Sequence, residues 1–192
     1  NNNTLNSLAI SATDYSTAVG VTFFMGAKGV KEWQRVQRIG IREKININHI
    51  MASASIPLFF PPWPIGKRHF GDGCLRNTAP LSPARKIGAS KILVIGVRKF
   101  RDEGLNDGNI VNPTLGRVLS VIINALFMDA IESDIERVKI INEALRTSSH
   151  SQDFRELDIN HIHPSQPLSE MAETRLEGLP PLLRFLISGL GN

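Results

Sequence analysis

Apolar and polar residues alternate in two neighbouring stretches near the start of the chain. Ser7 to Thr13 and Val19 to Met25 each follow a period of two, and the turn-forming residues Asp14, Tyr15 and Ser16 lie between them. A period of two places alternate side chains on one face, so the pattern predicts two strands joined by a turn. Asp14 is also a candidate acid, but aspartate commonly bonds its own backbone in turns, which favours a structural role there.

The stretch from Met51 to Pro83 has a different pattern, dense in small residues and prolines. The small residues 52–55 can pack closely against other backbone, and the prolines that follow prevent a helix and force an extended path. These prolines are Pro57, Pro61, Pro62 and Pro64. Ile65 to Phe70 then predicts a strand or hairpin arm, with its turn at Gly66 and Lys67.

Beyond this stretch the pattern indicates a helix followed by a strand. Ser82 is expected to be the N-cap and Pro83 the first helical residue, and Gly88 ends the short helix. The continuous apolar run from Lys91 to Val97, KILVIGV, is typical of a buried parallel strand. Loop, helix and buried strand together predict an α/β fold.

The second half of the chain contains one long helical pattern. Apolar residues recur at spacings of three and four from about Thr114 to Leu145, and the acids of this stretch are expected on its solvent face. They are Asp129, Glu132, Asp134 and Glu136.

Leu157 to His163 alternates like an edge strand, with His161 and His163 on one face, but the sequence specifies no further metal ligand. The leucine-rich segment Leu179 to Leu190 is expected to pack on its own domain.

Composition and charge narrow the classes of function. The 192 residues suit one domain, the formal net charge is +4, and no apolar run reaches the roughly 18 residues that a membrane span needs. Cations concentrate between Lys28 and Lys44 around Trp33; this segment suits an acidic lipid surface, although a solvated connection is favoured. No nucleic-acid module is visible.

Cys74 is the single cysteine, which excludes an internal disulfide and favours a packed residue over a reactive thiol.

Asp72 is the leading candidate for catalysis. Gly71 and Gly73 flank it, so the backbone can turn tightly and present the carboxylate to a neighbouring group. Asn77 follows closely and can hydrogen-bond a turn, so Gly71, Gly73 and Asn77 are expected to shape the loop around the acid.

These residues carry a resemblance to a known family. The run ASASIPLFFPP, then FGDG, then NTAPLSPARKIGASKILVIGV resembles the patatin-like phospholipases, whose pattern here is A-S-x-A-I-P-x-x-F-P-P, D-G-G or D-G-A, and N-x-P-x-x-x-A. SLAISATDYSTAVGVTFF resembles the strands before this motif, and DAIESDIERVKIINEAL and LPPLLRFLISGLG resemble closing helices of bacterial members. Cys74 departs from the pattern, because the family has glycine or alanine there.

The resemblance implies both a fold and an activity. The fold is a three-layer α/β/α arrangement with a mainly parallel central sheet, and the activity is hydrolysis of lipid acyl esters by a Ser-Asp dyad whose aspartate is Asp72. The family's G-x-S-x-G nucleophile motif does not occur in this sequence. Residues 1–192 are therefore expected to be the C-terminal portion of a patatin-like domain, inactive alone.

The expected partners follow from that activity. They are a lipid or phospholipid ester substrate, a membrane surface contacted peripherally, and the missing N-terminal portion of the same protein, with no nucleic acid. No cofactor and no metal are expected, and the compartment is expected to be the cytoplasm or the membrane periphery.

Three alternatives remain open from sequence. His69 lies three residues before Asp72 and raises a Ser-His-Asp triad, although a surface or cross-strand histidine is favoured. The chain can instead be a non-catalytic lipid-binding or regulatory domain of the same fold. It can also be a structural α/β domain in which the Asp-Gly pair is accidental.

Overall fold

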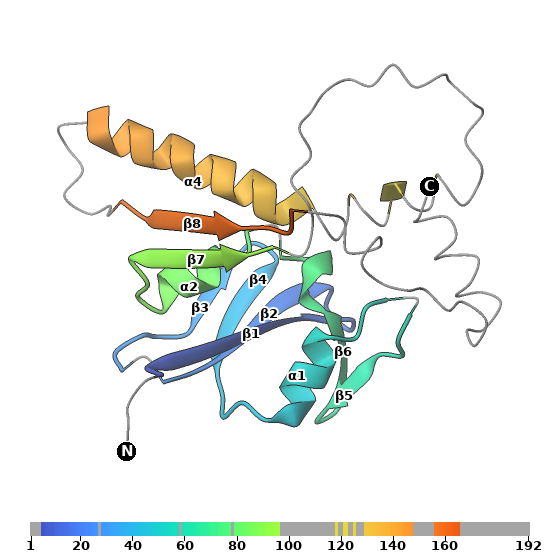
Figure 1. Ribbon diagram of the computed structural model, residues 1–192. Helices are drawn as coiled ribbons and strands as arrows, with labels where there is room; N and C mark the ends of the chain where they lie inside the picture. The colour runs from blue at the N-terminus through green and yellow to red at the C-terminus, as the bar shows by residue number, and fades with distance from the viewer. Residues whose placement is uncertain are drawn as a thin grey trace. The chain divides into compact units, whose positions relative to one another are not determined.

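The computed structural model describes residues 5–26, 28–57, 59–77, 79–96, 118, 121–122, 125, 129–147 and 156–165 (Figure 1). The chain divides into two compact units. The first comprises Asn1–Ile92 and Ala130–Asp158, and the second comprises Leu93–Asp129 and Ile159–Asn192. The predicted helix start at Thr114 and the segment Leu179 to Leu190 lie outside the described residues.

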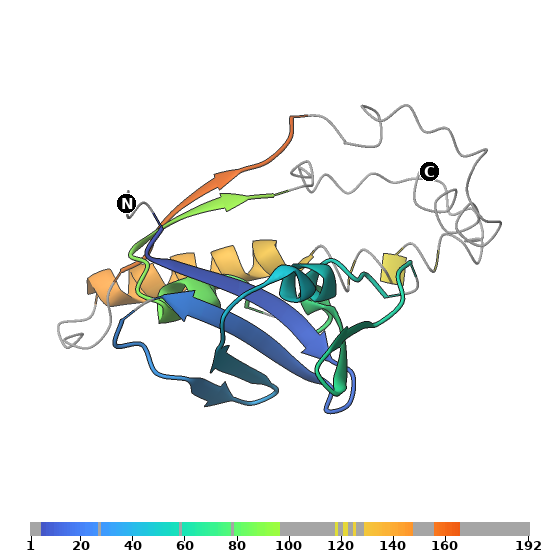
Figure 2. The ribbon, with the colours of Figure 1, turned by 90° about the horizontal axis from the view of Figure 1, so that it is seen from below.

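A six-stranded sheet with the order β3-β4-β2-β1-β6-β5 dominates the first unit. Its strands are β1 (Ser7–Asp14), β2 (Val19–Gly26), β3 (Trp33–Arg35), β4 (Arg38–Arg42), β5 (Trp63–Ile65) and β6 (Arg68–Asp72). β2 and β4 pair in parallel, and the other neighbours pair antiparallel. β1 and β2 are the long central strands, as Figure 2 shows from below.

The predicted hairpin at the start of the chain is confirmed. β1 and β2 pair from Ser7 with Gly26 to Asp14 with Val19. Asp14 makes the predicted turn contact, because its Oδ1 accepts a hydrogen bond from Ser16 N at 2.8 Å. Asp14 is fully buried, and its Oδ2 also forms an ion pair with Arg68 Nη1 at 3.0 Å, a long-range contact that the local pattern does not reveal.

The predicted three-layer fold with a mainly parallel central sheet is wrong. The main sheet is mixed and mostly antiparallel, and the helices of the described residues are few. Short turns join β1 to β2, β3 to β4 and β5 to β6, and a tight turn can join only antiparallel strands. The turn at Gly66 and Lys67 was predicted, and Gly66 has the positive φ of 60° that such a turn favours in glycine. The basic stretch around Trp33 forms another hairpin, made of β3 and β4. From the sequence, a solvated connection had been favoured for this stretch.

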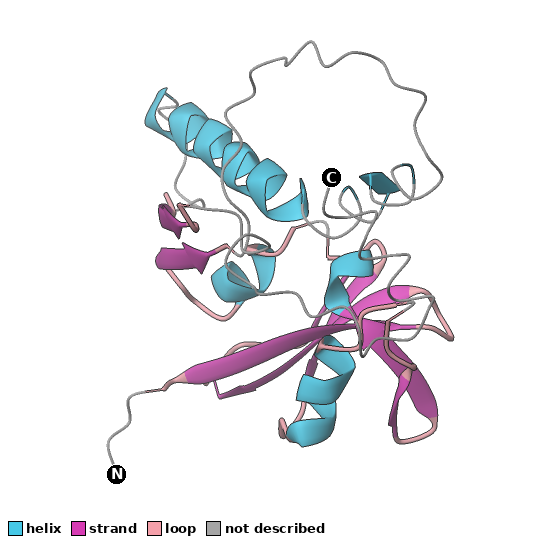
Figure 3. Cartoon of the chain, turned by 45° about the vertical axis from the view of Figure 1, so that its right-hand side comes forward, coloured by secondary structure: helices cyan, strands magenta, loops and turns pink. Residues whose placement is uncertain are grey.

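Helix α1 (Ile47–Ser53) packs on β1, β5 and β6 (Figure 3). No helix was predicted here from the sequence, although Asn46 and His49 form a capping box at its start. Beneath it lies the main core cluster, formed by buried residues from β1, β2, α1 and β6. They are Ala12, Val21, Phe23, Ala52 and Phe70. Within the small-residue run 52–55, Ala52 and Ser55 are buried but Ala54 is exposed, so the predicted close packing holds for only part of the run.

Strands β7 (Lys91–Ile95) and β8 (Asp158–Ile162) form a separate two-stranded sheet. Asp158 N donates to Ser90 O at 3.0 Å, and Gly96 N donates to Ile162 O at 2.8 Å. Because the bonded partners advance together along both strands, the pair is parallel, as Figure 2 also shows. The parallel strand was correctly predicted, but its complete burial was not, since Val94 is its only buried residue.

Helix α2 (Ser82–Lys86) begins one residue earlier than the pattern predicted. Leu81, not Ser82, is its N-cap, and it makes no side-chain cap. Instead Leu81 N donates to Asp134 Oδ2 of helix α4 (Asp129–Thr147) at 3.0 Å. Asp134 is buried, so its predicted place on the solvent face of α4 is wrong, whereas Glu132 and Glu136 are exposed as expected.

Candidate functional site

Asp72 lies at the end of β6, beside the middle of the sheet. It pairs with Ala12 of β1, and its backbone N donates to Ser55 O at 2.9 Å. Its carbonyl oxygen accepts a hydrogen bond from Thr13 Oγ1 at 2.8 Å. The backbone of Asp72 is therefore fixed from two sides, by β1 and by the segment that follows α1.

The Asp72 carboxylate begins a short 3-10 helix, η1 (Gly73–Leu75). Asp72 is its N-cap, and its Oδ1 accepts a hydrogen bond from Cys74 N at 2.9 Å. This bond fixes the orientation of the carboxylate, and the side chain is only half-buried. No hydroxyl group among the described residues donates a hydrogen bond to the carboxylate, so no serine of that part of the chain forms a dyad with it.

Neighbouring atoms leave no room for a side chain at either position that flanks Asp72, so both positions require glycine. A Cβ at Gly73 would lie 2.6 Å from the backbone oxygen of Ser11, which cannot move without disturbing β1. A Cβ at Gly71 would lie 2.2 Å from the hydroxyl oxygen of Tyr15. The Gly-Asp-Gly sequence thus lets β6 and η1 approach β1 and the aromatic ring of Tyr15 at the same time.

Cys74 and Tyr15 are two ionisable groups that interact with the carboxylate. Burial raises the pKa of the Cys74 thiol far above its usual range, and the hydrogen bond to Asp72 and that residue's negative charge raise it further. The pKa of Tyr15 is also raised, first by burial and then by the charges of Cys74 and Asp72. Cys74 is therefore protonated at neutral pH, which opposes a nucleophilic role and agrees with the packed residue that was expected.

Asn77 joins this loop through its backbone. Asn77 N donates to Gly73 O at 2.9 Å and closes the turn that follows η1. The structure thus brings together Gly71, Asp72, Gly73 and Asn77 in one loop. The sequence could not identify Thr13, Tyr15 and Ser55 as their neighbours, because each of these contacts joins segments distant along the chain.

His69 does not contact the Asp72 carboxylate. Side chains alternate along a strand, so His69 and Asp72 point to opposite faces of β6. His69 is exposed and contributes its backbone oxygen, which accepts a hydrogen bond from Tyr15 N at 3.0 Å. The geometry therefore opposes the alternative Ser-His-Asp triad and agrees with a cross-strand histidine.

The two histidines near the end of the described chain do not form a metal cluster. The rings of His161 and His163 lie 5.6 Å apart, edge to face. Among the described residues, no three His, Cys, Asp or Glu side chains gather closely enough to hold a metal ion. The described helices also contain none that is long and apolar enough to cross a membrane.

Comparison with known proteins adds no assignment. No protein-family model, no curated protein and no solved structure matches this chain. The resemblance to the patatin-like phospholipases therefore depends only on the residues that carry it, and the role of Asp72 must be argued from its surroundings.

Proposed function

We propose that this chain supplies the general base, Asp72, of a serine hydrolase that acts on lipid acyl esters. The observation that carries the proposal is the placement of the carboxylate. It is half-buried, its backbone is bonded to Ser55 and Thr13, and Cys74 N orients Oδ1. A general base needs such a fixed position, because proton transfer depends on hydrogen-bond distance to the reacting group. The motif around Asp72, which resembles that of patatin-like phospholipases, supports the same role.

The chemistry requires a serine from outside the described residues. Ser55 Oγ already donates to Met51 O at 2.7 Å, and Ser11 Oγ bonds Thr22 Oγ1 at 3.2 Å. In the proposed reaction Asp72 takes the proton of the serine hydroxyl while the serine oxygen attacks the ester carbonyl. The proton then passes to the departing alcohol. Water next attacks the acyl-serine ester while Asp72 takes its proton; the bond between the acyl carbon and the serine oxygen then breaks, and Asp72 returns the proton to that oxygen, which releases the fatty acid and restores the serine.

The proposal is tested by Asp72→Asn in the complete polypeptide, assayed with a short-chain lipid ester. Asparagine keeps the oxygen that accepts from Cys74 N but cannot take the proton. We expect turnover to fall by about 100-fold or more, as is typical when a general base is removed, with a melting temperature close to wild type. Asp158→Asn is the matched control, because Asp158 is an exposed acid on β8. Full turnover by Asp72→Asn would refute the assignment.

A non-catalytic lipid-binding domain is the second candidate. The observation in its favour is that capping η1 already explains the Asp72 carboxylate without any reaction. Under this alternative the complete polypeptide binds vesicles, hydrolyses no ester and gains no mass from a fluorophosphonate, which labels activated serines. Trp33 would not be the membrane anchor, because its ring stacks on Phe24 at 4.9 Å and covers Gly40.

A further inference from the structure

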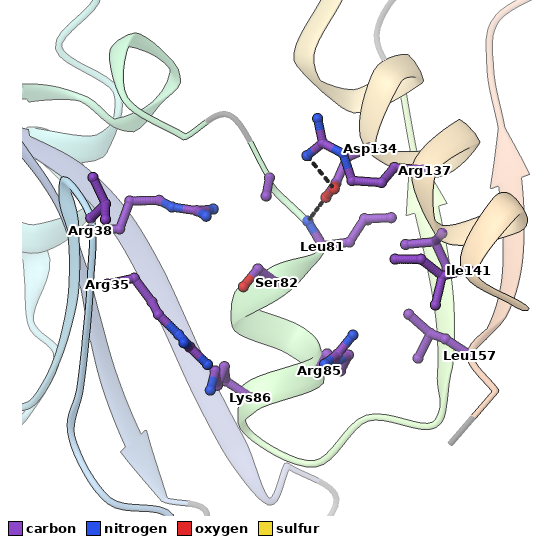
Figure 4. A pocket seen from close by; sticks show the side chains of 13 residues that line it. Arg35, Arg38, Leu81, Ser82, Arg85, Lys86, Asp134, Arg137, Ile141 and Leu157 are labelled. Carbon is purple, nitrogen blue, oxygen red and sulfur yellow. Dashed lines mark hydrogen bonds and ion pairs between the residues drawn. The ribbon is translucent and has the colours of Figure 1, made fainter. Parts of the chain in front are cut away.

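A hollow of about 420 Å³ lies between the β3–β4 hairpin, α2 and α4 in the first unit (Figure 4). This volume is within the usual range for small-molecule sites. Asp72, Tyr15 and Cys74 are not among the residues that line it, so the hollow is separate from the site proposed above.

The hollow carries an excess of positive charge. Figure 4 shows Arg35 and Arg38 extending from the hairpin toward α2, which contributes Arg85 and Lys86. Among the described residues, none of these four side chains has a carboxylate partner. Four cations that share one hollow repel one another, and a bound anion would relieve that repulsion.

Asp134 is the single acid among the described residues that line the hollow, and it already has partners. Asp134 accepts a hydrogen bond from Leu81 N at 3.0 Å and lies 3.8 Å from Arg137 Nη1. Because it is buried and bonded to α2 and α4, Asp134 holds the walls of the hollow together. It therefore balances Arg137 and leaves the other four cations available to a ligand.

The opposite part of the lining is apolar. Ala79, Leu81 and Leu157 are buried, and Ile141 of α4 is partly exposed beside them. Leu157 is held there by the side-chain amide of Asn142, whose Nδ2 donates to Leu157 O at 2.8 Å and whose Oδ1 accepts from Leu157 N at 3.1 Å. The hollow thus has one cationic side and one apolar side, both built on folded elements.

We propose that this hollow binds an alkyl phosphate monoester. The phosphate dianion would lie among Arg35, Arg38, Arg85 and Lys86, since guanidinium groups match phosphate oxygens in pairs. The alkyl chain would lie along Leu81, Ile141 and Leu157. A free inorganic phosphate would use only the cationic side, and a simple alcohol only the apolar side.

The test is isothermal titration calorimetry of the full chain with hexyl phosphate, inorganic phosphate and hexanol. We expect hexyl phosphate to bind at least tenfold more tightly than either of the other two. Equal affinity for inorganic phosphate and hexyl phosphate would overturn the role of the apolar side. If hexyl phosphate does not bind, the proposal is wrong. This holds even if vesicles of phosphatidic acid do bind.

Two sets of variants separate the two sides of the hollow. Arg85→Gln/Lys86→Gln should weaken hexyl phosphate binding at least tenfold, whereas Lys28→Gln/Lys67→Gln, which removes the same charge from exposed positions outside the lining, should change it less than twofold. Equal weakening by both pairs would mean diffuse charge attraction and refute the site. Ile141→Ser should weaken hexyl phosphate binding and leave inorganic phosphate binding unchanged. Each variant is first compared with wild type by its melting temperature.

Discussion

The six-stranded sheet and the β7–β8 pair both contain apolar residues, but those residues differ greatly in burial. In the sheet, Ala12 and Phe24 are fully buried. In the strand pair, Leu93 is 58% exposed, Ile95 is 71% exposed and Ile162 is 55% exposed. An apolar run therefore predicts a strand, but the number of neighbours around that strand decides whether its side chains are buried.

The difference follows from what covers each strand. β1 has β2 on one side, β6 on the other and α1 against one face. Among the described strands, β7 has only β8 as a hydrogen-bonded neighbour. An isolated two-stranded sheet is marginally stable in water, so the strand pair is expected to contribute little to the stability of the fold.

The largest expected effect lies in the six-stranded sheet, at Phe24. Its ring is fully buried, stacks on Trp33 at 4.9 Å and lies 4.8 Å from the guanidinium carbon of Arg42. Phe24→Ala should lower the free energy of unfolding by about 3–5 kcal/mol, because it removes buried apolar surface and leaves a cavity. Urea unfolding followed by tryptophan fluorescence measures this. A loss below about 1 kcal/mol would show that the two regions differ less than their burial indicates.

A smaller effect is expected at high pH, also in the six-stranded sheet. The unfolded Cys74 thiol ionises near pH 8.5, whereas the folded thiol holds its proton to higher pH because burial and Asp72 raise its pKa. Above about pH 8.5 the unfolded state therefore binds fewer protons, and the free energy of unfolding falls as pH rises. Cys74→Ser should lose less stability than wild type between pH 8 and 10. Identical pH profiles for the two proteins would contradict the raised pKa.

The smallest effect on stability is expected in the β7–β8 pair. Ile95→Ala removes a side chain that is mostly in water, so the free energy of unfolding should change by no more than about 0.5 kcal/mol. The same urea unfolding experiment measures it. A loss comparable to that of Phe24→Ala would mean that a further part of the protein covers this strand in solution.

The sequence predicted features whose partners are close along the chain. The β1–β2 hairpin, the turn at Gly66 and the turn contact of Asp14 each depend on a few neighbouring residues. The overall fold class was wrong because it depends on which distant strands pair. Asp134 was misplaced for the same reason: its partner, Leu81 N, lies 53 positions away.

The candidate site was predictable in part. The Gly-Asp-Gly sequence made Asp72 the candidate acid, and the structure explains the two glycines, since Gly73 meets the backbone of β1 and Gly71 meets Tyr15. The contacts from Thr13 and Ser55 were not predictable, because they arise from strand pairing and from the segment that follows α1, a helix that was not predicted. The cationic hollow was missed because its charges come from the β3–β4 hairpin and α2, which are separated along the chain.

The pairing of β1 with β6 also bears on the order in which the protein folds. β1 and β2 are neighbours along the chain, and such hairpins form within about 1–10 μs. The contact between Thr13 and Asp72 joins residues 59 positions apart, so a long loop must close before it forms. A nascent chain with only its first hairpin in place would still lack this contact. The backbone of Asp72 is thus expected to reach its place beside β1 only after the first hairpin has formed, whereas the bond from Cys74 N to its carboxylate needs only neighbouring residues.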